Sequence, residues 1–221
     1  MDLMEAMKNR HSVRQYAGKP IGTEILAALR EEIAACNRES SLHIQLVAGE
    51  PKAFDSLIAH YGKFSGVTNY IALVGPKSDR LDELCGYFGE RLVLRAQQLG
   101  LNSCWVALTY KRIPGTFQIG PSERLTVVIA LGYGAVQGIA HKSKPAEAVS
   151  NLSADSPEWF RAGVSAALLA PTAMNQQKFH LNWANGKVSA KAGLGFFSKV
   201  DLGIVKYHFE LGAGKGSSIW S

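Results

Sequence analysis

Two arginines and a serine lie close together near the start of the chain, in the segment Arg10-His11-Ser12-Val13-Arg14. Guanidinium and hydroxyl groups donate hydrogen bonds, so these side chains could converge on one anion through charge-assisted contacts. The segment looks too irregular to bury its guanidiniums. From these residues alone, an anion site and a solvated basic turn are equally good interpretations.

A second polar segment, Ala170-Pro171-Thr172-Ala173-Met174-Asn175-Gln176-Gln177, follows a predicted helix that Pro171 ends. It is rich in backbone and amide groups that can both donate and accept hydrogen bonds. Such a turn could bind the polar edge of a flat ring, and a simple capped loop is the alternative.

Other motifs that carry chemistry are incomplete. In the glycine-rich stretch 132–138, Gln137 stands where a dinucleotide fingerprint needs its third glycine, and a loop follows in place of a helix. The tail 212–216 lacks the Ser or Thr that follows the lysine of a P-loop. The histidines have no metal-binding spacing, so we expect no metal site.

The chain is basic, with 24 Lys and Arg against 18 acidic residues and a net charge of +6. This balance suits an anionic partner. The densest basic groups are Lys8, Arg10 and Arg14, then Lys142 and Lys144, with His11 and His141 beside them. Two small clusters favour a phosphate pocket over a nucleic-acid groove, which would need clustered arginines and aromatic pairs. Nucleic-acid binding is the weaker hypothesis.

Length and composition are those of an ordinary globular protein, with 221 residues, 47% hydrophobic and 19% charged. The longest apolar runs, such as 125–131, are too short to cross a bilayer. The first residues have no apolar segment typical of secretion signals. We therefore expect a cytoplasmic protein with no membrane partner, and its three cysteines should be free thiols.

Periodicity predicts an α+β fold. Helices are expected over 2–9, from Thr23, from about Lys52, and over 80–99, 157–169 and 201–211. Strands are expected over 42–47, 70–74, 103–106, 125–131, 179–183 and 187–190. Asn185-Gly186 predicts a tight hairpin between the last two strands.

The segments 42–47 and 179–184 share the pattern apolar, His, apolar, amide, apolar. Both follow a helix, and a linker-like composition over 132–156 separates the two portions. We interpret this as a degenerate duplication with halves at about 1–140 and 150–221, with coincidence between two half-buried strands as the alternative.

Four segments together resemble the FMN-dependent nitroreductase family. Residues 10–16 match R-[RH]-S-x-[RK]-x-[FY], and 170–177 match A-P-S/T-x-x-N-x-Q. Residues 100–105 match G-L-G/N-x-x-W, and 142–144 match a basic pair after the last core strand. In ordinary members the A-P-S/T turn closely follows the R-H-S segment, whereas here it comes far downstream. The chain therefore resembles a fused branch of that family. This implies one domain, 1–221, with a mixed sheet flanked by helices and two halves related as a pseudo-dimer.

The resemblance also implies a set of residues that bind FMN. The phosphate would be held by Arg10 and Ser12, with His11 in the same segment, and by Lys142 and Lys144. Arg14 would lie near the N1 and O2 edge of the ring, where positive charge favours the reduced anion. The ring would be bordered by Pro171, Thr172, Ala173, Asn175 and Gln177, and N5 would face the backbone of Val106, Ala107 and Leu108. The family often has glycines where this chain has Ala107 and Leu108, and proline where it has Lys178.

The implied activity is that of an FMN-dependent oxidoreductase. It would take hydride from NADH or NADPH onto flavin N5 and pass electrons to a small-molecule acceptor such as a nitroaromatic or a quinone. The alternative is a protein that stores or senses FMN without turnover, which a ring face blocked by Leu108 and Lys178 would favour. Because one chain carries both parts of the implied site, we expect a monomer and not an obligate homodimer.

Overall fold

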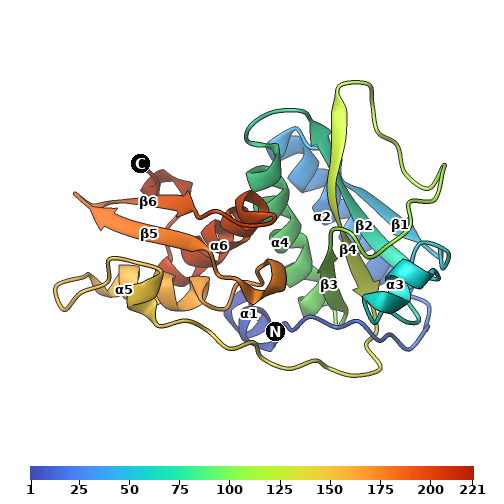
Figure 1. Cartoon of the computed structure of the whole chain (residues 1–221), viewed down its shortest axis with the longest axis horizontal. Helices are drawn as coiled ribbons and strands as arrows, with labels where there is room; N and C mark the ends of the chain where they lie inside the picture. Colours follow the sequence, from blue (N-terminus) through green and yellow to red (C-terminus); the bar gives the residue numbers. More distant parts are fainter. The chain divides into compact units, whose positions relative to one another are not determined.

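The computed structural model describes residues 1–221 and divides into two compact units (Figure 1). The sheet unit comprises Asn9–Leu81 and Leu92–Ala140. The hairpin unit comprises Met1–Lys8, Asp82–Arg91 and His141–Ser221. Each unit contains buried hydrophobic residues of its own.

The sheet unit contains four strands in the order β1-β2-β4-β3. They are β1 (Gln45–Ala48), β2 (Asn69–Pro76), β3 (Asn102–Val106) and β4 (Glu123–Gly132). All three strand pairs are antiparallel. An isolated parallel bridge between Ser12 and Ser103 adds the opening segment to the edge at β3, while the four strands themselves pair only in the antiparallel direction.

Both faces of this sheet are buried, which explains the nearly continuous apolar sequence of β2 and β4. Tyr70 and Ala72 of β2 belong to a core cluster on one face, which also contains Phe54 and Phe64. The intervening side chain of Ile71 points to the other face and is also fully buried.

The helices of the sheet unit are α2 (Thr23–Ser40), α3 (Leu57–Tyr61) and the C-terminal part of α4 (Leu81–Gln98). α2 packs against β1. The long helix predicted over 80–99 is confirmed as α4. α2 begins at Thr23, and Gly22 occupies its N-cap position without a side-chain hydrogen bond.

Two elements are shorter than predicted because side chains form hydrogen bonds with the backbone groups that the longer elements would need. Asn37 bonds both the N–H and the carbonyl of Ile44, so β1 begins only at Gln45. The Glu50 carboxylate accepts hydrogen bonds from the N–H groups of Lys52 and Ala53, which makes a turn where a helix was expected. The helix α3 follows that turn.

The hairpin unit contains the antiparallel strands β5 (Phe179–Ala184) and β6 (Lys187–Ala192). Asn185 and Gly186 have φ values of 50° and 74°, as a two-residue hairpin turn requires, so that prediction is confirmed. The helix α6 (Ser198–Ala213) packs against both strands and against α5 (Glu158–Ala167). α1 (Leu3–Asn9) belongs to this unit except for its last residue.

Two glycines let α4 and α6 approach closely within the hairpin unit. A Cβ atom on Gly86 would collide with the carbonyl oxygen of Val200, and one on Gly203 would collide with that of Glu83. In the same unit, Nε2 of His208 lies 2.8 Å from a carboxylate oxygen of Glu90, and neither side chain has exposed surface.

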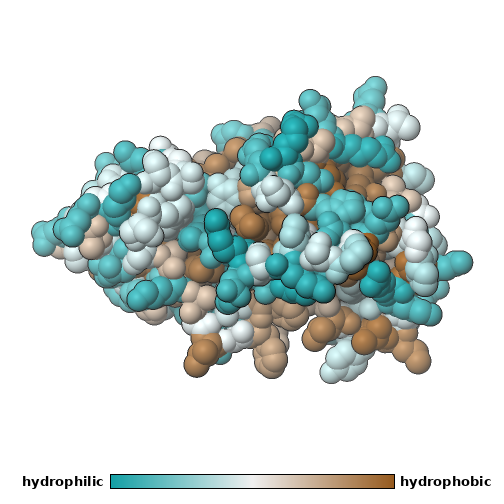
Figure 2. Space-filling model, turned by 90° about the horizontal axis from the view of Figure 1, so that it is seen from above, coloured by the Kyte–Doolittle hydropathy of each residue, from teal (hydrophilic) through white to brown (hydrophobic).

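On the face seen in Figure 2, hydrophilic side chains cover much of the surface and hydrophobic groups lie among them. Large apolar side chains with high exposure include Leu57 on α3, and Leu194 and Phe196 after β6. The three cysteines are buried free thiols, as predicted. No helix combines the length and the apolar character that a membrane span needs.

Candidate functional site

The opening segment lies along the edge of the sheet next to β3. Ser12 bridges to Ser103, and the N–H of Val13 donates to the carbonyl of Ser103 at 3.0 Å. Further on, the buried Tyr16 donates from its hydroxyl to the carbonyl of Ala130 at 3.3 Å. These contacts give an irregular sequence the fixed geometry of a sheet edge.

Three polar side chains of this segment act on one buried thiol. Burial raises the pKa of Cys104, whereas Arg14, a hydrogen bond from Ser12, and Arg10 lower that pKa. The two guanidiniums and the hydroxyl are therefore gathered beside the same point of β3. This arrangement brings together three of the residues that the sequence assigned to an anion site.

Burial differs among these side chains. Arg10 is only 4% exposed, so the prediction that the segment leaves its guanidiniums unburied is wrong for this residue. The bridge between Ser12 and Ser103 makes the segment part of the sheet edge and not a free surface turn. Ser12 and Arg14 are exposed, and His11 is half-buried beside Gly138.

The strand β3 also leads to the residues assigned to the ring. Val106 is the last residue of β3 and is buried, and Ala107 is half-buried. The side chain of Leu108 is 71% exposed, so its bulk extends into solvent. Cys104 lies two residues before Val106, the last residue of β3.

The hairpin unit holds the other predicted residues, and Gln177 connects them. Its side chain is 3% exposed and accepts a hydrogen bond from the N–H of Lys144 at 2.9 Å. Its amide nitrogen donates to the carbonyl of Lys142 and to the side chain of Asn175. The polar turn and the lysine segment are thus one hydrogen-bonded substructure.

The two lysines of this substructure differ in the hydrogen bonds that they form. The ammonium of Lys144 donates to the carbonyls of Gln176 and Gln177 at 2.8 and 3.1 Å. An ammonium has three N–H donors, so one is left for an anion. Lys142 is exposed, and only its carbonyl is engaged with the turn.

The other residues of the turn that the sequence assigned to the ring differ in their exposure. Pro171 is buried after α5, whereas Thr172 and Ala173 are half-buried and Asn175 is exposed. The hydroxyl of Thr172 accepts a hydrogen bond from the N–H of Gln177 at 3.0 Å. The turn therefore presents small and amide side chains on a fixed backbone.

Sequence reasoning missed one residue that holds this turn, Asp201. Its carboxylate accepts hydrogen bonds from the N–H of Ala173 and from the amide of Gln176, both at 2.9 Å. Burial raises the pKa of Asp201 to about 6, and the two hydrogen bonds oppose that rise. α6 begins at Ser198 and not at Asp201 as predicted, so this carboxylate lies in the first turn. A charged residue between Val200 and Leu202 was the signal.

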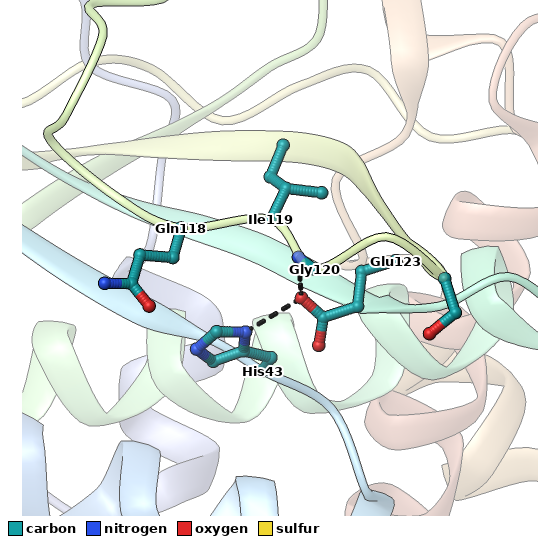
Figure 3. Close-up of a pocket in the computed structure, with 6 residues that line it drawn as sticks. His43, Gln118, Ile119, Gly120 and Glu123 are labelled. Carbon is teal, nitrogen blue, oxygen red and sulfur yellow. Dashed lines mark hydrogen bonds and ion pairs between the residues drawn. The ribbon is translucent and has the colours of Figure 1, made fainter.

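A separate pocket of about 510 Å³ lies in the sheet unit (Figure 3). Within it, Nδ1 of His43 lies 3.0 Å from a carboxylate oxygen of Glu123, which also accepts from the N–H of Gly120. The hydrogen bonds from His43 and Gly120 lower the pKa of Glu123. This pair attaches the loop before β4 to the residues before β1.

Residues 2–213 of the chain match the model of a family described as "Putative TM nitroreductase". No curated protein matches the chain significantly.

Solved structures have the same fold. The putative nitroreductase of Thermotoga maritima is 22% identical, with a TM-score of 0.66, over 96% of this chain and 83% of that one. A putative nitroreductase in complex with FMN from Desulfovibrio desulfuricans is 16% identical, with a TM-score of 0.54, over 71% and 99%. A putative NADH dehydrogenase/NAD(P)H nitroreductase of Parabacteroides distasonis is 20% identical, with a TM-score of 0.53, over 66% and 95%.

Proposed function

We propose that this chain, which belongs to the nitroreductase family, is an oxidoreductase that uses FMN. The observation that carries the proposal is the pairing of the segment that holds Arg10, Ser12 and Arg14 with β3, beside Cys104. Guanidinium and hydroxyl groups are donors that suit FMN, because both its phosphate and the edge of its reduced ring carry negative charge. The FMN complex of the Desulfovibrio desulfuricans relative supports the choice of ligand.

In the sheet unit, Arg10 and Ser12 are assigned to the phosphate, and Arg14 to the N1 and O2 edge of the ring. The backbone at 106–108 is assigned to N5. The sheet edge fixes all of these groups, which gives them the preorganisation that cofactor binding needs. Leu108 is itself exposed, whereas Val106 is buried at the end of β3.

In the hairpin unit, the exposed Lys142 and the remaining donor of Lys144 are also assigned to the phosphate. The turn 171–177 is assigned to the ring. Its rigidity, provided by Gln177, supports a role in orienting a planar group.

Bound FMN would supply hydride acceptance at N5 and electron transfer to an acceptor. The protein's part is then to bind, orient and provide positive charge. Arg14 favours negative charge at the N1 edge, and Ala173 and Thr172 limit the space around the ring. No acid, base or nucleophile of the chain is needed for this role.

We further propose NADH or NADPH as the hydride donor and a small molecule such as a nitroaromatic or a quinone as the acceptor. The similarity to the putative NADH dehydrogenase/NAD(P)H nitroreductase of Parabacteroides distasonis supports a nicotinamide donor. We also propose that a monomer is the active form, because a single chain carries both sets of residues. The hypothesis of a fused pseudo-dimer belongs to the same proposal.

The direct test is an absorbance spectrum of the purified protein with added FMN, followed by anaerobic NADH and then NADPH. We expect stoichiometric bound flavin and its bleaching by at least one nucleotide. Protein that binds no FMN would contradict the proposal. Bound FMN that neither nucleotide reduces would instead indicate the storage or sensing alternative, and the mass in solution would test the monomer.

A further inference from the structure

The loop between β6 and α6 exposes large apolar side chains to solvent. Leu194 is 95% exposed and Phe196 is 71% exposed. In the polar turn before β5, Met174 is 78% exposed. We call these three residues the apolar tip. Exposed apolar side chains that lie together mark surfaces that bind a partner or a membrane.

The loop is held against the polar turn, so the apolar tip has a defined position. The side-chain amide of Gln176 donates to the carbonyl of Phe196 at 2.6 Å. A Cβ atom on Gly195 would lie 2.3 Å from the side-chain oxygen of Gln176 and 2.9 Å from a side-chain carbon of Lys178, so this close approach needs glycine. Phe197 has a φ of 56°, which a bulky residue keeps only where its surroundings enforce it. Loop and turn therefore form one fixed surface.

The charged residues around the apolar tip have one sign. Between residues 162 and 200 the chain has four lysines, no arginine and no aspartate or glutamate. Lys178, Lys191 and Lys199 are exposed, and each lies beside the loop or within three residues of its apolar side chains. Asp201, which follows this stretch, is only 3% exposed. The stretch is therefore positively charged and has no acidic group of its own.

We propose that the apolar tip and these three lysines attach the protein reversibly to the surface of a membrane rich in anionic lipid. Leu194 and Phe196 insert at the boundary between headgroups and acyl chains, and the lysines lie among the lipid phosphates. Such attachment combines apolar insertion with a basic patch and needs no spanning helix. It replaces the sequence-based expectation of no membrane partner, which considered only spanning segments and secretion signals. It does not depend on the proposed flavin.

The type of cation favours a lipid surface over an acidic protein. Arginine suits carboxylates in protein interfaces, because its guanidinium forms paired hydrogen bonds, whereas the ammonium of lysine acts as a point charge. All cations of residues 162–200 are lysines, which suits a diffuse layer of negative charge. The apolar stem of lysine can also lie along the membrane boundary while its ammonium stays hydrated. A second copy of the chain is a poor occupant, because two positive surfaces repel each other.

The test is cosedimentation of the full chain with vesicles of phosphatidylcholine alone and of phosphatidylcholine mixed with phosphatidylserine. We expect the wild type to sediment with the mixed vesicles and much less with the neutral ones. High salt should weaken the binding, because it screens the attraction between lysines and lipid.

Two double variants separate the two contributions. Leu194→Ser with Phe196→Ser removes the apolar insertion and should lower the vesicle partition coefficient at least roughly tenfold. Lys191→Gln with Lys199→Gln should lower it roughly 30-fold, because each lysine near an anionic membrane contributes roughly fivefold. All four side chains are exposed, so both variants should fold, which circular dichroism verifies.

Helix α3 offers matched controls. Leu57 is 89% exposed, and the exposed Lys52 and Lys63 lie on either side of it in the sequence. The exposed Asp55 adds a negative charge there that the apolar tip lacks. Leu57→Ser, and Lys52→Gln with Lys63→Gln, should therefore bind the mixed vesicles as the wild type does.

Each outcome decides for or against the inference. Wild type that stays in solution with the mixed vesicles would overturn it, and so would control variants that lose as much binding as the variants of the surface. Binding that the Leu194→Ser, Phe196→Ser variant keeps in full would show attraction to any polyanion, an acidic protein included, and would also overturn it. Flavin absorbance of the same samples reports FMN binding separately, so a failure of the proposed function leaves this test valid.

Discussion

The backbone N–H of Lys144 donates to the side-chain oxygen of Gln177, 33 positions further along the chain. Together with the bonds from the Lys144 ammonium to the turn, this contact makes the lysine segment and the turn a single rigid substructure. Changes to one part should therefore disturb the other.

Gln177→Met should lower the free energy of unfolding by about 1–3 kcal/mol, because the N–H of Lys144 would lose its partner in a partly buried place. Methionine has nearly the same volume, so the lost hydrogen bonds dominate the effect. Urea unfolding measures the change. Gln118→Met, at an exposed position, is the matched control, and an equal loss in both variants would contradict the assigned role.

Gly203→Ala should destabilise the hairpin unit. Overpacking costs about 1–3 kcal/mol, while alanine regains about 1 kcal/mol of helix propensity. Because the added Cβ would meet backbone atoms of Glu83 and Tyr87, the clash should exceed that gain. Gly216 has open space around it, so Gly216→Ala should leave thermal unfolding nearly unchanged. A neutral Gly203→Ala would show that the two helices lie further apart.

The buried pair of His208 and Glu90 should couple strongly. His208→Leu alone should cost about 3–5 kcal/mol, because it leaves a carboxylate in the core without its imidazole partner. The double variant with Glu90→Leu should cost clearly less than the sum of the two single variants. Urea unfolding of all three variants checks this, and additive costs would rule out a direct interaction.

Asp201→Asn should raise stability at pH 8. The folded pKa of about 6 lies above the unfolded value of about 3.9, so the folded state binds more protons between these values and wild-type stability falls as the pH rises through that window. Full ionisation costs the wild type about 3 kcal/mol above the window, and asparagine avoids this cost. We expect a gain of about 1–3 kcal/mol at pH 8 that disappears near pH 4. A gain independent of pH would contradict the assigned titration.

The local signals in the sequence were sufficient for most of the fold. Asn185-Gly186 predicted the hairpin because only a few residues tolerate two positive φ values in succession. The apolar periodicity over 80–99 predicted α4 because it was long and regular. Strand β1 and helix α3 were misjudged in extent, since Asn37 and Glu50 intercept backbone groups in a way that periodicity does not encode.

The sequence predicted the residue types and the segments of the candidate site, but not how the side chains are arranged in space. The sequence placed Arg10, Ser12 and Arg14 together, but their convergence on Cys104 depends on a bridge to a strand far along the chain. Asp201 was missed because its partners in the turn lie 25 and 28 positions before it. Contacts at such separations leave no periodic trace in one sequence.

The FMN affinity of Arg10→Ala tests the central claim most directly. Loss of a charge-assisted hydrogen bond corresponds to about 1.5–3 kcal/mol, or roughly 10- to 150-fold in the dissociation constant. Arg38→Ala, an exposed arginine in the same unit, is the matched control, and circular dichroism verifies that both variants fold. The account predicts a loss of FMN binding in Arg10→Ala and none in Arg38→Ala. Wild-type affinity in a folded Arg10→Ala protein would contradict it.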